Sequence, residues 1–249
     1  MIWQMLTFRG FILLINNIMN NYKIIIIIFI IYLIWYSNEA EYIKEKPTLE
    51  EDGFMKLYNI KKENILSYLP KDYIFIDYKY TIKGCTLSTF HRDVTSSQYI
   101  YKTKYPVYTY IIYCNDGPHI SLCPGSHKIV PFNFNKSKTI NGKKNEGYLF
   151  NCDLIHAGAI NDNKDKRLVI QYKVCHKDDL NKLKHLIGIN KFQKNDCNNN
   201  LYNDMILRKL SLLFPYITNH IFTSYLQSKQ DNILQKIINY IYKRDFYNM

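Results

Sequence analysis

Residues 105–125 read YPVYTYIIYCNDGPHISLCPG, and their pattern decides the expected fold. Residues 105–114 are rich in Tyr, Ile, Val and Thr, which favour strands because branched and aromatic side chains pack well on a pleated surface. The turn-forming residues 115–118 (NDGP) end this run before a second apolar run at residues 119–122. We therefore expect two short strands joined by a tight turn.

The same pattern of short strands and turns continues on both sides of this stretch. Further strands are expected at residues 73–80, 147–151 and 167–174, with a polar loop at 161–166. A short helix is expected at residues 61–69, and little else between the strands favours a helix. Short strands at this spacing are typical of an antiparallel sandwich or jelly roll. The predicted fold class is mainly β with flanking helices.

Beyond residue 177 the sequence changes to helical patterns. Helices are expected at residues 178–187, 201–213 and 231–242, the last with its apolar side chains on one face. We expect a C-terminal helical extension over residues 181–249 that packs on the barrel or on a neighbouring molecule. Because its polar face carries Lys and Arg, a role at a membrane surface is the alternative.

The N-terminal segment is nearly all apolar from residue 11 to residue 35. Its densest part, residues 24–35, is shorter than the ~20 residues that a membrane span needs. The charges that flank it are basic before and acidic after, which favours a cytoplasmic N-terminus: Arg9 and Lys23, then Glu39, Glu41 and Glu45. Residues 1–37 are therefore expected to be a single-pass signal anchor in a membrane, with a cleaved secretory signal as the alternative. Met1 and Met19 both remain possible starts.

Composition narrows the class of protein. A chain of 249 residues is too long for a disulfide mini-scaffold, and 15% aromatic residues argue against disorder. The formal net charge of +12 comes from scattered Lys in a sequence with the bias of A/T-rich codons, so we expect no nucleic-acid partner. The six cysteines show neither a C-x-x-C pair nor the spacing of a zinc site.

Three residues form a candidate metal centre. His91 and Asp93 flank Arg92 on an extended segment, where side chains two apart point the same way. His156 follows a predicted strand and precedes two small residues, which leave space around its ring. Two histidines and one carboxylate form the facial triad of non-haem Fe(II), which keeps coordination positions open. Taken singly, each residue also has an ordinary interpretation, a surface pair for His91 and Asp93 and a core histidine for His156.

Arg167 is a candidate anion-binding residue. It opens the apolar run 168–170, so its side chain could point into a barrel, where a guanidinium would pair with a carboxylate. The alternative is a surface arginine in a polar loop beside Lys164 and Lys166.

The order of these motifs resembles the phytanoyl-CoA dioxygenase (PhyH) family of Fe(II)/2-oxoglutarate oxygenases. That family has an HxD motif, a Pro-Gly-Ser-His turn, a distal histidine and an arginine, which are met here by residues 91–93, the turn 122–128 (LCPGSHK), His156 and Arg167. The opening stretch 49–57 (LEEDGFMKL) is similar to the family's N-terminal strand. The resemblance covers about residues 47–176.

The resemblance implies a double-stranded β-helix (jelly-roll or cupin-like) dioxygenase domain, here over residues 38–180. His91, Asp93 and His156 would bind Fe(II) as the catalytic residues, and Arg167 would bind the far carboxylate of 2-oxoglutarate. The expected reaction consumes O₂, hydroxylates a small-molecule or lipid-like substrate and releases succinate and CO₂. Asp93 points to hydroxylation, because halogenating relatives have a small residue there. Many relatives place Ser or Thr two residues after the arginine, where this chain has Val169.

Two other classes of protein stay open at this stage. One is a non-catalytic jelly roll that serves as a binding or structural module, for which a lost ligand would be expected. The other is a cupin-like protein that binds zinc or manganese without 2-oxoglutarate, in which Arg167 would lack an anionic partner. Residues 124–127 are interpreted as architecture, since Pro-Gly shapes the turn.

Overall fold

The structure is a computed structural model, and it describes residues 22–29, 40–42, 46–58, 61–84, 89–128, 136–160, 167–195, 208–209 and 211–212. The chain divides into two compact units, Met1–Asn38 and Glu39–Met249. In the first unit the described residues are 22–29, which form a helix with exposed side chains.

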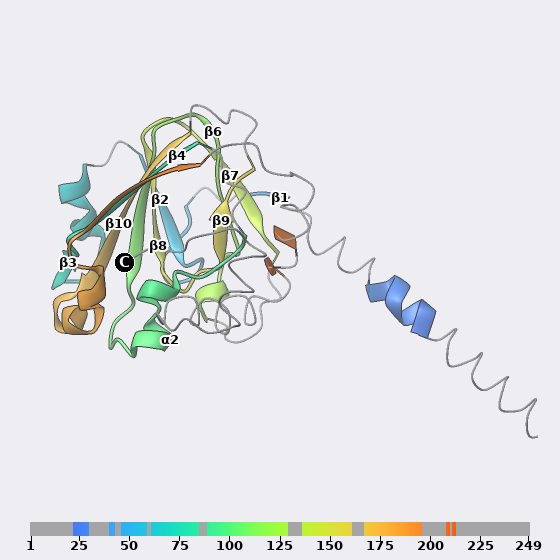
Figure 1. Cartoon of the computed structure of the whole chain (residues 1–249), viewed down its shortest axis with the longest axis horizontal. Coiled ribbons are helices and arrows are strands. Elements are labelled where there is room, and N and C mark those ends of the chain that lie inside the picture. Colours follow the sequence, from blue (N-terminus) through green and yellow to red (C-terminus); the bar gives the residue numbers. More distant parts are fainter. Residues whose placement is uncertain are drawn as a thin grey trace, which may run out of the picture. The chain divides into compact units, whose positions relative to one another are not determined.

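The second unit is built from two β-sheets that form a jelly roll (Figure 1). The larger sheet has the strand order β11-β4-β10-β5-β8-β2, and the smaller one has the order β1-β7-β6-β9. The strands of the larger sheet are β2 (Phe54–Tyr58), β4 (Tyr78–Gly84), β5 (Tyr108–Tyr113), β8 (Glu146–Asn151), β10 (Leu168–His176) and β11 (Ile189–Asn195), with β3 (Tyr73–Phe75) paired to β10. The strands of the smaller sheet are β1 (Ala40–Glu41), β6 (Gly117–Leu122), β7 (Lys138–Gly142) and β9 (His156–Gly158). The predicted fold class is confirmed.

The alternation of side chains along β5, β8 and β10 creates the inner face of the larger sheet. Lys173 lies opposite Thr109, and Thr109 lies opposite Phe150 on the next strand. Val169 and Tyr113 form a second opposite pair, nearer the other end of the strands. One buried cluster fills the space inside the barrel: Phe54, Ile111, Tyr113, Ile120, Leu122, Ile140, Tyr148, Phe150, Leu154 and Val169. The inner face thus carries two polar residues, Lys173 and Thr109, on the same strands as the residues of this hydrophobic core.

The short helices flank the sheets. The expected helix at residues 61–69 is the 3-10 helix η1 (Lys62–Tyr68), and the one expected at 178–187 is the 3-10 helix η5 (Lys177–Leu186). The remaining described helical residues outside the first unit are η2 (Val94–Ser96), α2 (Gln98–Tyr101), η3 (Ser126–Lys128) and residues 208–209 and 211–212. A second buried cluster lies on the outer face of the larger sheet and includes Ile65 of η1 and Leu149.

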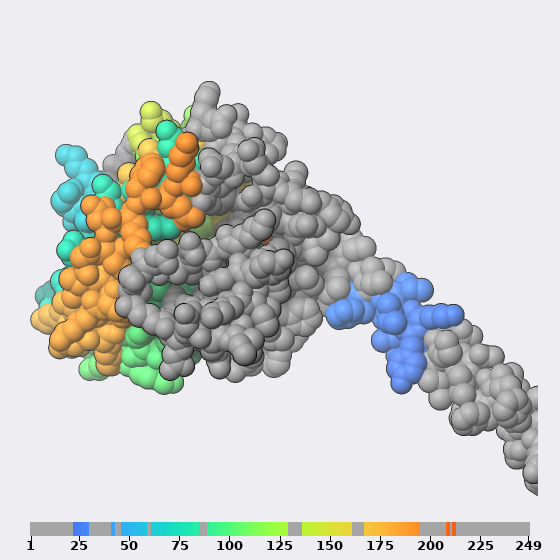
Figure 2. All heavy atoms as spheres, viewed as in Figure 1, coloured from blue at the N-terminus to red at the C-terminus, as the bar shows by residue number. Residues whose placement is uncertain are grey.

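Two strands differ from the sequence-based expectation. The single strand expected at residues 73–80 is broken into β3 and β4, because the amide of Ile76 donates to the carbonyl of Lys173 and the amide of Tyr78 turns back to Ile76. Strand β11, which the sequence did not predict, pairs in parallel with β4. Its sequence INKFQKN is mostly polar, and Phe192 is 64% exposed. The orange residues of this part of the chain lie on the face shown in Figure 2.

The expected single-pass signal anchor is wrong. Among the residues that the structure describes, no helix combines the length and the apolar character that crossing a membrane requires. The described helical stretch, residues 22–29, rises about 12 Å, against the ~30 Å of a bilayer core. The other residues of the apolar N-terminus lie outside the described residues, as do the helix expected at 231–242 and most of the one at 201–213.

Gly53, directly before β2, provides a test of the packing between this strand and the Pro-Gly-Ser-His turn. Gly53 and Gly188 both have left-handed backbones, with φ of +81° and +80°. A Cβ at Gly53 would lie 2.4 Å from Nδ1 of His127, whereas none would meet any atom within 4 Å at Gly188. We expect Gly53→Ala to lower the free energy of unfolding by about 2–4 kcal/mol and Gly188→Ala by about 1 kcal/mol, measured by urea titration. Equal losses would show that the close approach at Gly53 costs nothing.

Candidate metal centre

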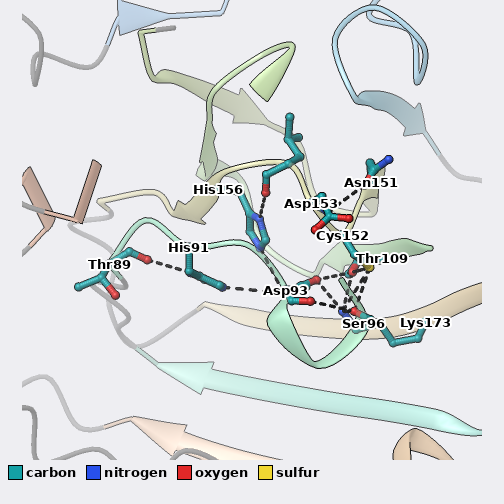
Figure 3. Close-up of polar contacts among 11 residues, drawn as sticks. Thr89, His91, Asp93, Ser96, Thr109, Asn151, Cys152, Asp153, His156 and Lys173 are labelled. Carbon is teal, nitrogen blue, oxygen red and sulfur yellow. Dashed lines mark hydrogen bonds and ion pairs between the residues drawn. The ribbon is translucent and has the colours of Figure 1, made fainter. Parts of the chain in front are cut away.

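The structure brings His91, Asp93 and His156 together at one end of the barrel (Figure 3). His156 begins β9, and the backbones of His91 and His156 exchange two hydrogen bonds of 2.9 Å in an isolated antiparallel bridge. The amide of Asp93 donates to the carbonyl of Cys152 at 2.8 Å. Main-chain bonds between two distant segments therefore hold all three side chains in register.

Hydrogen bonds to the backbone set which ring nitrogen of each histidine faces the site. Nδ1 of His91 lies 2.8 Å from the carbonyl oxygen of Thr89, and Nδ1 of His156 lies 2.8 Å from that of Leu154. A carbonyl can only accept, so Nδ1 carries the proton in both rings. The Nε2 lone pairs are thus directed toward Asp93, as in metal sites whose histidines are oriented by an outer shell of carbonyls.

The distances between the three side chains fit a single small cation. Oδ1 of Asp93 lies 3.6 Å from Nε2 of His156 and 3.9 Å from Nε2 of His91, and all three ligand atoms lie within 4.8 Å of one another. Adjacent ligands of an octahedral ion with bonds of about 2.1 Å are about 3 Å apart, so closure on a metal requires movements of about 1 Å or less. The side chain of His91 is 37% exposed, which leaves one side of the cluster open to solvent.

Burial and neighbouring charges determine the protonation states of His156 and Asp93. Burial, with a further contribution from His91, lowers the pKa of His156 to about 4. Burial alone would raise the pKa of Asp93, but Lys173 and the two histidines outweigh it and hold that pKa far below its usual range. A neutral imidazole and an ionised carboxylate are the forms that bind a metal.

A buried lysine completes the surroundings of Asp93. Nζ of Lys173, a residue 1% exposed, lies 2.6 Å from Oδ2 of Asp93. It also donates to Oγ of Ser96 at 2.9 Å and to Oγ1 of Thr109 at 2.8 Å, and Thr109 donates to the same Oδ2 (Figure 3). The two oxygens of Asp93 are therefore used differently: Oδ1 faces the histidines and Oδ2 faces the lysine.

The residue between the two HxD ligands joins the site to the Pro-Gly-Ser-His turn. The buried guanidinium of Arg92 donates to the carbonyls of Ser126, at 3.0 Å, and of Asp153. Oγ of Ser126 accepts from the amide of Ile155 at 2.8 Å, next to His156. Ser126 thus contacts both ligand-bearing segments, and His127 is not among the clustered ligands.

Arg208 and Ser211 contact the same two segments. Arg208 donates to the carbonyl of Gly158 at 2.8 Å, and its guanidinium lies 4.5 Å over the ring of Phe90. Oγ of Ser211 accepts from the amide of Phe90 at 2.8 Å, directly before His91. This part of the C-terminal region therefore helps to hold the candidate site.

Arg167 lies toward the other end of the inner face. It is 3% exposed, and its guanidinium carbon lies 5.7 Å from the centre of the Tyr113 ring. Arg167 precedes Lys173 by six residues, so both side chains point to the same face of the sheet. Two buried cations thus lie along this segment, Arg167 directly before β10 and beside Tyr113, and Lys173 within β10 and beside the metal ligands.

Sequence reasoning missed Lys173, Thr109 and the role of Arg92. A signal for Lys173 exists, because it shares the parity of Arg167 and Val169 along an apolar strand and so points to the inner face. In a chain with 33 Lys and Arg residues, one lysine within a strand gave no reason to single it out.

The strands and the cluster together define a class of protein: a jelly roll that carries two histidines and a carboxylate at one end of its inner face. No protein-family model and no curated protein matches the sequence. Among solved structures, the chain is similar to SnoK, a non-heme alpha-ketoglutarate-dependent carbocyclase of nogalamycin biosynthesis, at 12% identity over 55% of this chain and 86% of that one, with a TM-score of 0.38. SnoN, an epimerase of the same description, shows 10% identity over 51% and 79%, with a TM-score of 0.37.

A third similar structure, EvdMO1, shows 12% identity over 45% of this chain, with a TM-score of 0.36, and the match spans 29% of its own length. At these identities and TM-scores the likenesses carry no weight for the chain's chemistry, which we infer from the site.

The depressed pKa of His156 predicts an acid-labile site in the metal-free protein. An unfolded histidine binds its proton below about pH 6.5, but folded His156 does so only below about 4. Between these values the unfolded state binds more protons, so stability falls as the pH is lowered, and His156 accounts for about 2 kcal/mol of the loss between pH 7 and pH 4.5. Urea unfolding in EDTA at pH 7 and pH 4.5 measures this loss, which His156→Gln should reduce by about that amount. An unchanged loss in the variant would assign the acid lability to other groups.

Proposed function

We propose that the protein is an Fe(II)/2-oxoglutarate-dependent dioxygenase of the PhyH type, which hydroxylates a small-molecule or lipid-like substrate and releases succinate and CO₂. The observation that carries the proposal is the convergence of the bare Nε2 atoms of His91 and His156 on Oδ1 of Asp93. Three protein ligands on one side of an octahedral ion leave three positions for co-substrate and O₂.

The donor set fits an Fe(II) centre with open coordination positions better than it fits a structural zinc site, in which protein ligands fill every position. Structural zinc is bound by four ligands and usually by thiolates. Cys152 is not among the clustered ligands, and its Sγ accepts from Ser96 at 3.0 Å and lies 3.7 Å from Nζ of Lys173, which faces Oδ2 of Asp93. A cluster of two imidazoles and one carboxylate is therefore the donor set that the described residues offer.

Arg167 is the proposed anchor for the far carboxylate of 2-oxoglutarate. A buried guanidinium fork matches a carboxylate through two parallel hydrogen bonds. Tyr113 lies next to Arg167 and is the proposed hydroxyl donor at the place where the sequence has Val169 instead of Ser or Thr. Bound iron would supply the activation of O₂, and the chain itself positions the co-substrate between the iron and Arg167.

The chain's own residues prepare the site before any ligand binds. The carbonyls of Thr89 and Leu154 hold the two Nδ1 protons, so no proton must leave either imidazole when the metal enters. Phe150 packs against His156 with ring centres 4.5 Å apart, which restricts how that imidazole can turn. The exposed edge of His91 leaves the opposite side for the substrate to approach.

The test is an anaerobic titration of the purified full chain with Fe(II) and 2-oxoglutarate. We expect a metal-to-ligand charge-transfer band in the visible spectrum and, after O₂ is admitted, succinate in proportion to 2-oxoglutarate consumed. A band without succinate would indicate a binding module that retains the site. Absence of both, with Fe(II) still bound, would favour a cupin-like metal protein that does not use 2-oxoglutarate.

A further inference from the structure

We propose that Lys173 is a positioning residue that restricts Asp93 to binding the metal through one oxygen and so keeps three coordination positions open. The inference rests on the metal centre of the proposed function. It concerns how many positions the protein leaves free, which is a property of the chain's own side chains.

The geometry around Asp93 separates its two oxygens. Oδ1 faces Nε2 of both histidines at 3.6 and 3.9 Å, while Oδ2 receives hydrogen bonds from Lys173, at 2.6 Å, and Thr109. A carboxylate can bind a cation through one oxygen or both. With Oδ2 occupied by an ammonium group, rotation of the carboxylate toward the metal would break a charge-assisted hydrogen bond in a buried site.

The lysine is itself fixed in place. An ammonium group has three donors, and oxygens of Asp93, Ser96 and Thr109 accept from Nζ at 2.6, 2.9 and 2.8 Å. These partners come from three segments: the HxD segment, η2 and β5. Lys173 lies on β10, opposite Thr109 in the sheet, so backbone pairing sets its distance from Asp93.

The arrangement matters because the co-substrate and O₂ together need three open coordination positions on the metal. A keto acid that chelates a metal takes two positions, and O₂ takes a third. If Asp93 bound through both oxygens, only two positions would remain, and a chelated co-substrate would leave none for O₂. We infer that Lys173 preserves the third position.

The experiment counts the water molecules bound to Mn(II) in the full chain, from the broadening of its EPR lines in ¹⁷O-enriched water. We expect three waters in the wild type, two in Lys173→Met and three in Lys173→Gln, whose amide keeps a donor for Oδ2. The number of exchangeable waters in Lys173→Met therefore falls to about two thirds. No 2-oxoglutarate or substrate is needed.

A matched control is Lys177→Met. Lys177 pairs with Asp72 at the same 2.6 Å, but on the surface and away from the cluster, so three waters should remain. Circular dichroism and thermal melting of each variant show whether it is folded, and a wild-type count of two waters overturns the role of Lys173 even where a variant does not fold.

Two waters in the wild type, or three in both the wild type and Lys173→Met, overturn the role of Lys173 and leave the metal centre standing. Failure of the wild type to bind Mn(II) or Fe(II) overturns the metal centre and this inference together. Three waters in the wild type with two in Lys173→Met support the inference, even if no succinate is ever formed.

Discussion

Asp93→Ala is expected to abolish Fe(II) binding and also to lower the free energy of unfolding of the metal-free protein by about 3–5 kcal/mol. The first effect follows from loss of the one anionic ligand. The second follows because Lys173, buried and 2.6 Å from Oδ2, is left without its carboxylate, and removal of one partner of a buried pair carries a cost of this size. Isothermal titration with Fe(II) and urea unfolding in EDTA measure the two effects separately.

The double variant Asp93→Ala/Lys173→Met is the control. Because it removes both charges, its stability is expected to exceed that of Asp93→Ala, whereas its metal binding stays lost. If the double variant is instead as unstable as the sum of the two single variants, the pair is not coupled and the loss comes from packing alone.

Arg167→Met is expected to raise the dissociation constant for 2-oxoglutarate by about 100-fold, or about 2.7 kcal/mol, without changing Fe(II) affinity. The variant removes two charge-assisted hydrogen bonds to the far carboxylate, while Arg167 is not among the clustered metal ligands. Titration of the charge-transfer band gives the dissociation constant.

Arg167→Lys and Tyr113→Phe refine this result. Lysine keeps the charge but loses the planar fork, so an intermediate loss is expected. Removal of the Tyr113 hydroxyl is expected to weaken 2-oxoglutarate binding by about 10-fold, the value of one hydrogen bond. Unchanged 2-oxoglutarate binding in Arg167→Met would contradict the assignment of the anchor.

The jelly roll could be predicted from the sequence because strands and turns are recognised from patterns within a short stretch of residues. The run at residues 105–125 contains two strands and their turn, and β5 and β6 form there within a few residues of the expected ends. Strand β11 could not be predicted in the same way, because its polar sequence is ordered by pairing with β4, more than a hundred residues earlier. The signal anchor was wrong, because no helix among the described residues is long and apolar enough to cross a membrane, and the described N-terminal helix covers residues 22–29 alone.

The candidate site was likewise predicted only in part. Residue types and their order were enough to propose His91, Asp93, His156 and Arg167 as a group. The sequence could not show that each imidazole donates to a carbonyl two residues before it, nor that a lysine from β10 reaches the carboxylate. Those contacts depend on the register of strands that are distant in sequence.

The contacts of Arg208 and Ser211 give the site an order of assembly in time. His91, Asp93 and His156 have all been synthesised by residue 156, but the residue that binds the carbonyl of Gly158 comes 50 residues after it. Ser211, which accepts from the amide of Phe90, is separated from it by 121 residues. Since chains fold from the N-terminus as they are made, the ligand segments leave the ribosome before these contacts can form. Metal is therefore expected to bind stably only after the chain beyond residue 211 has been released.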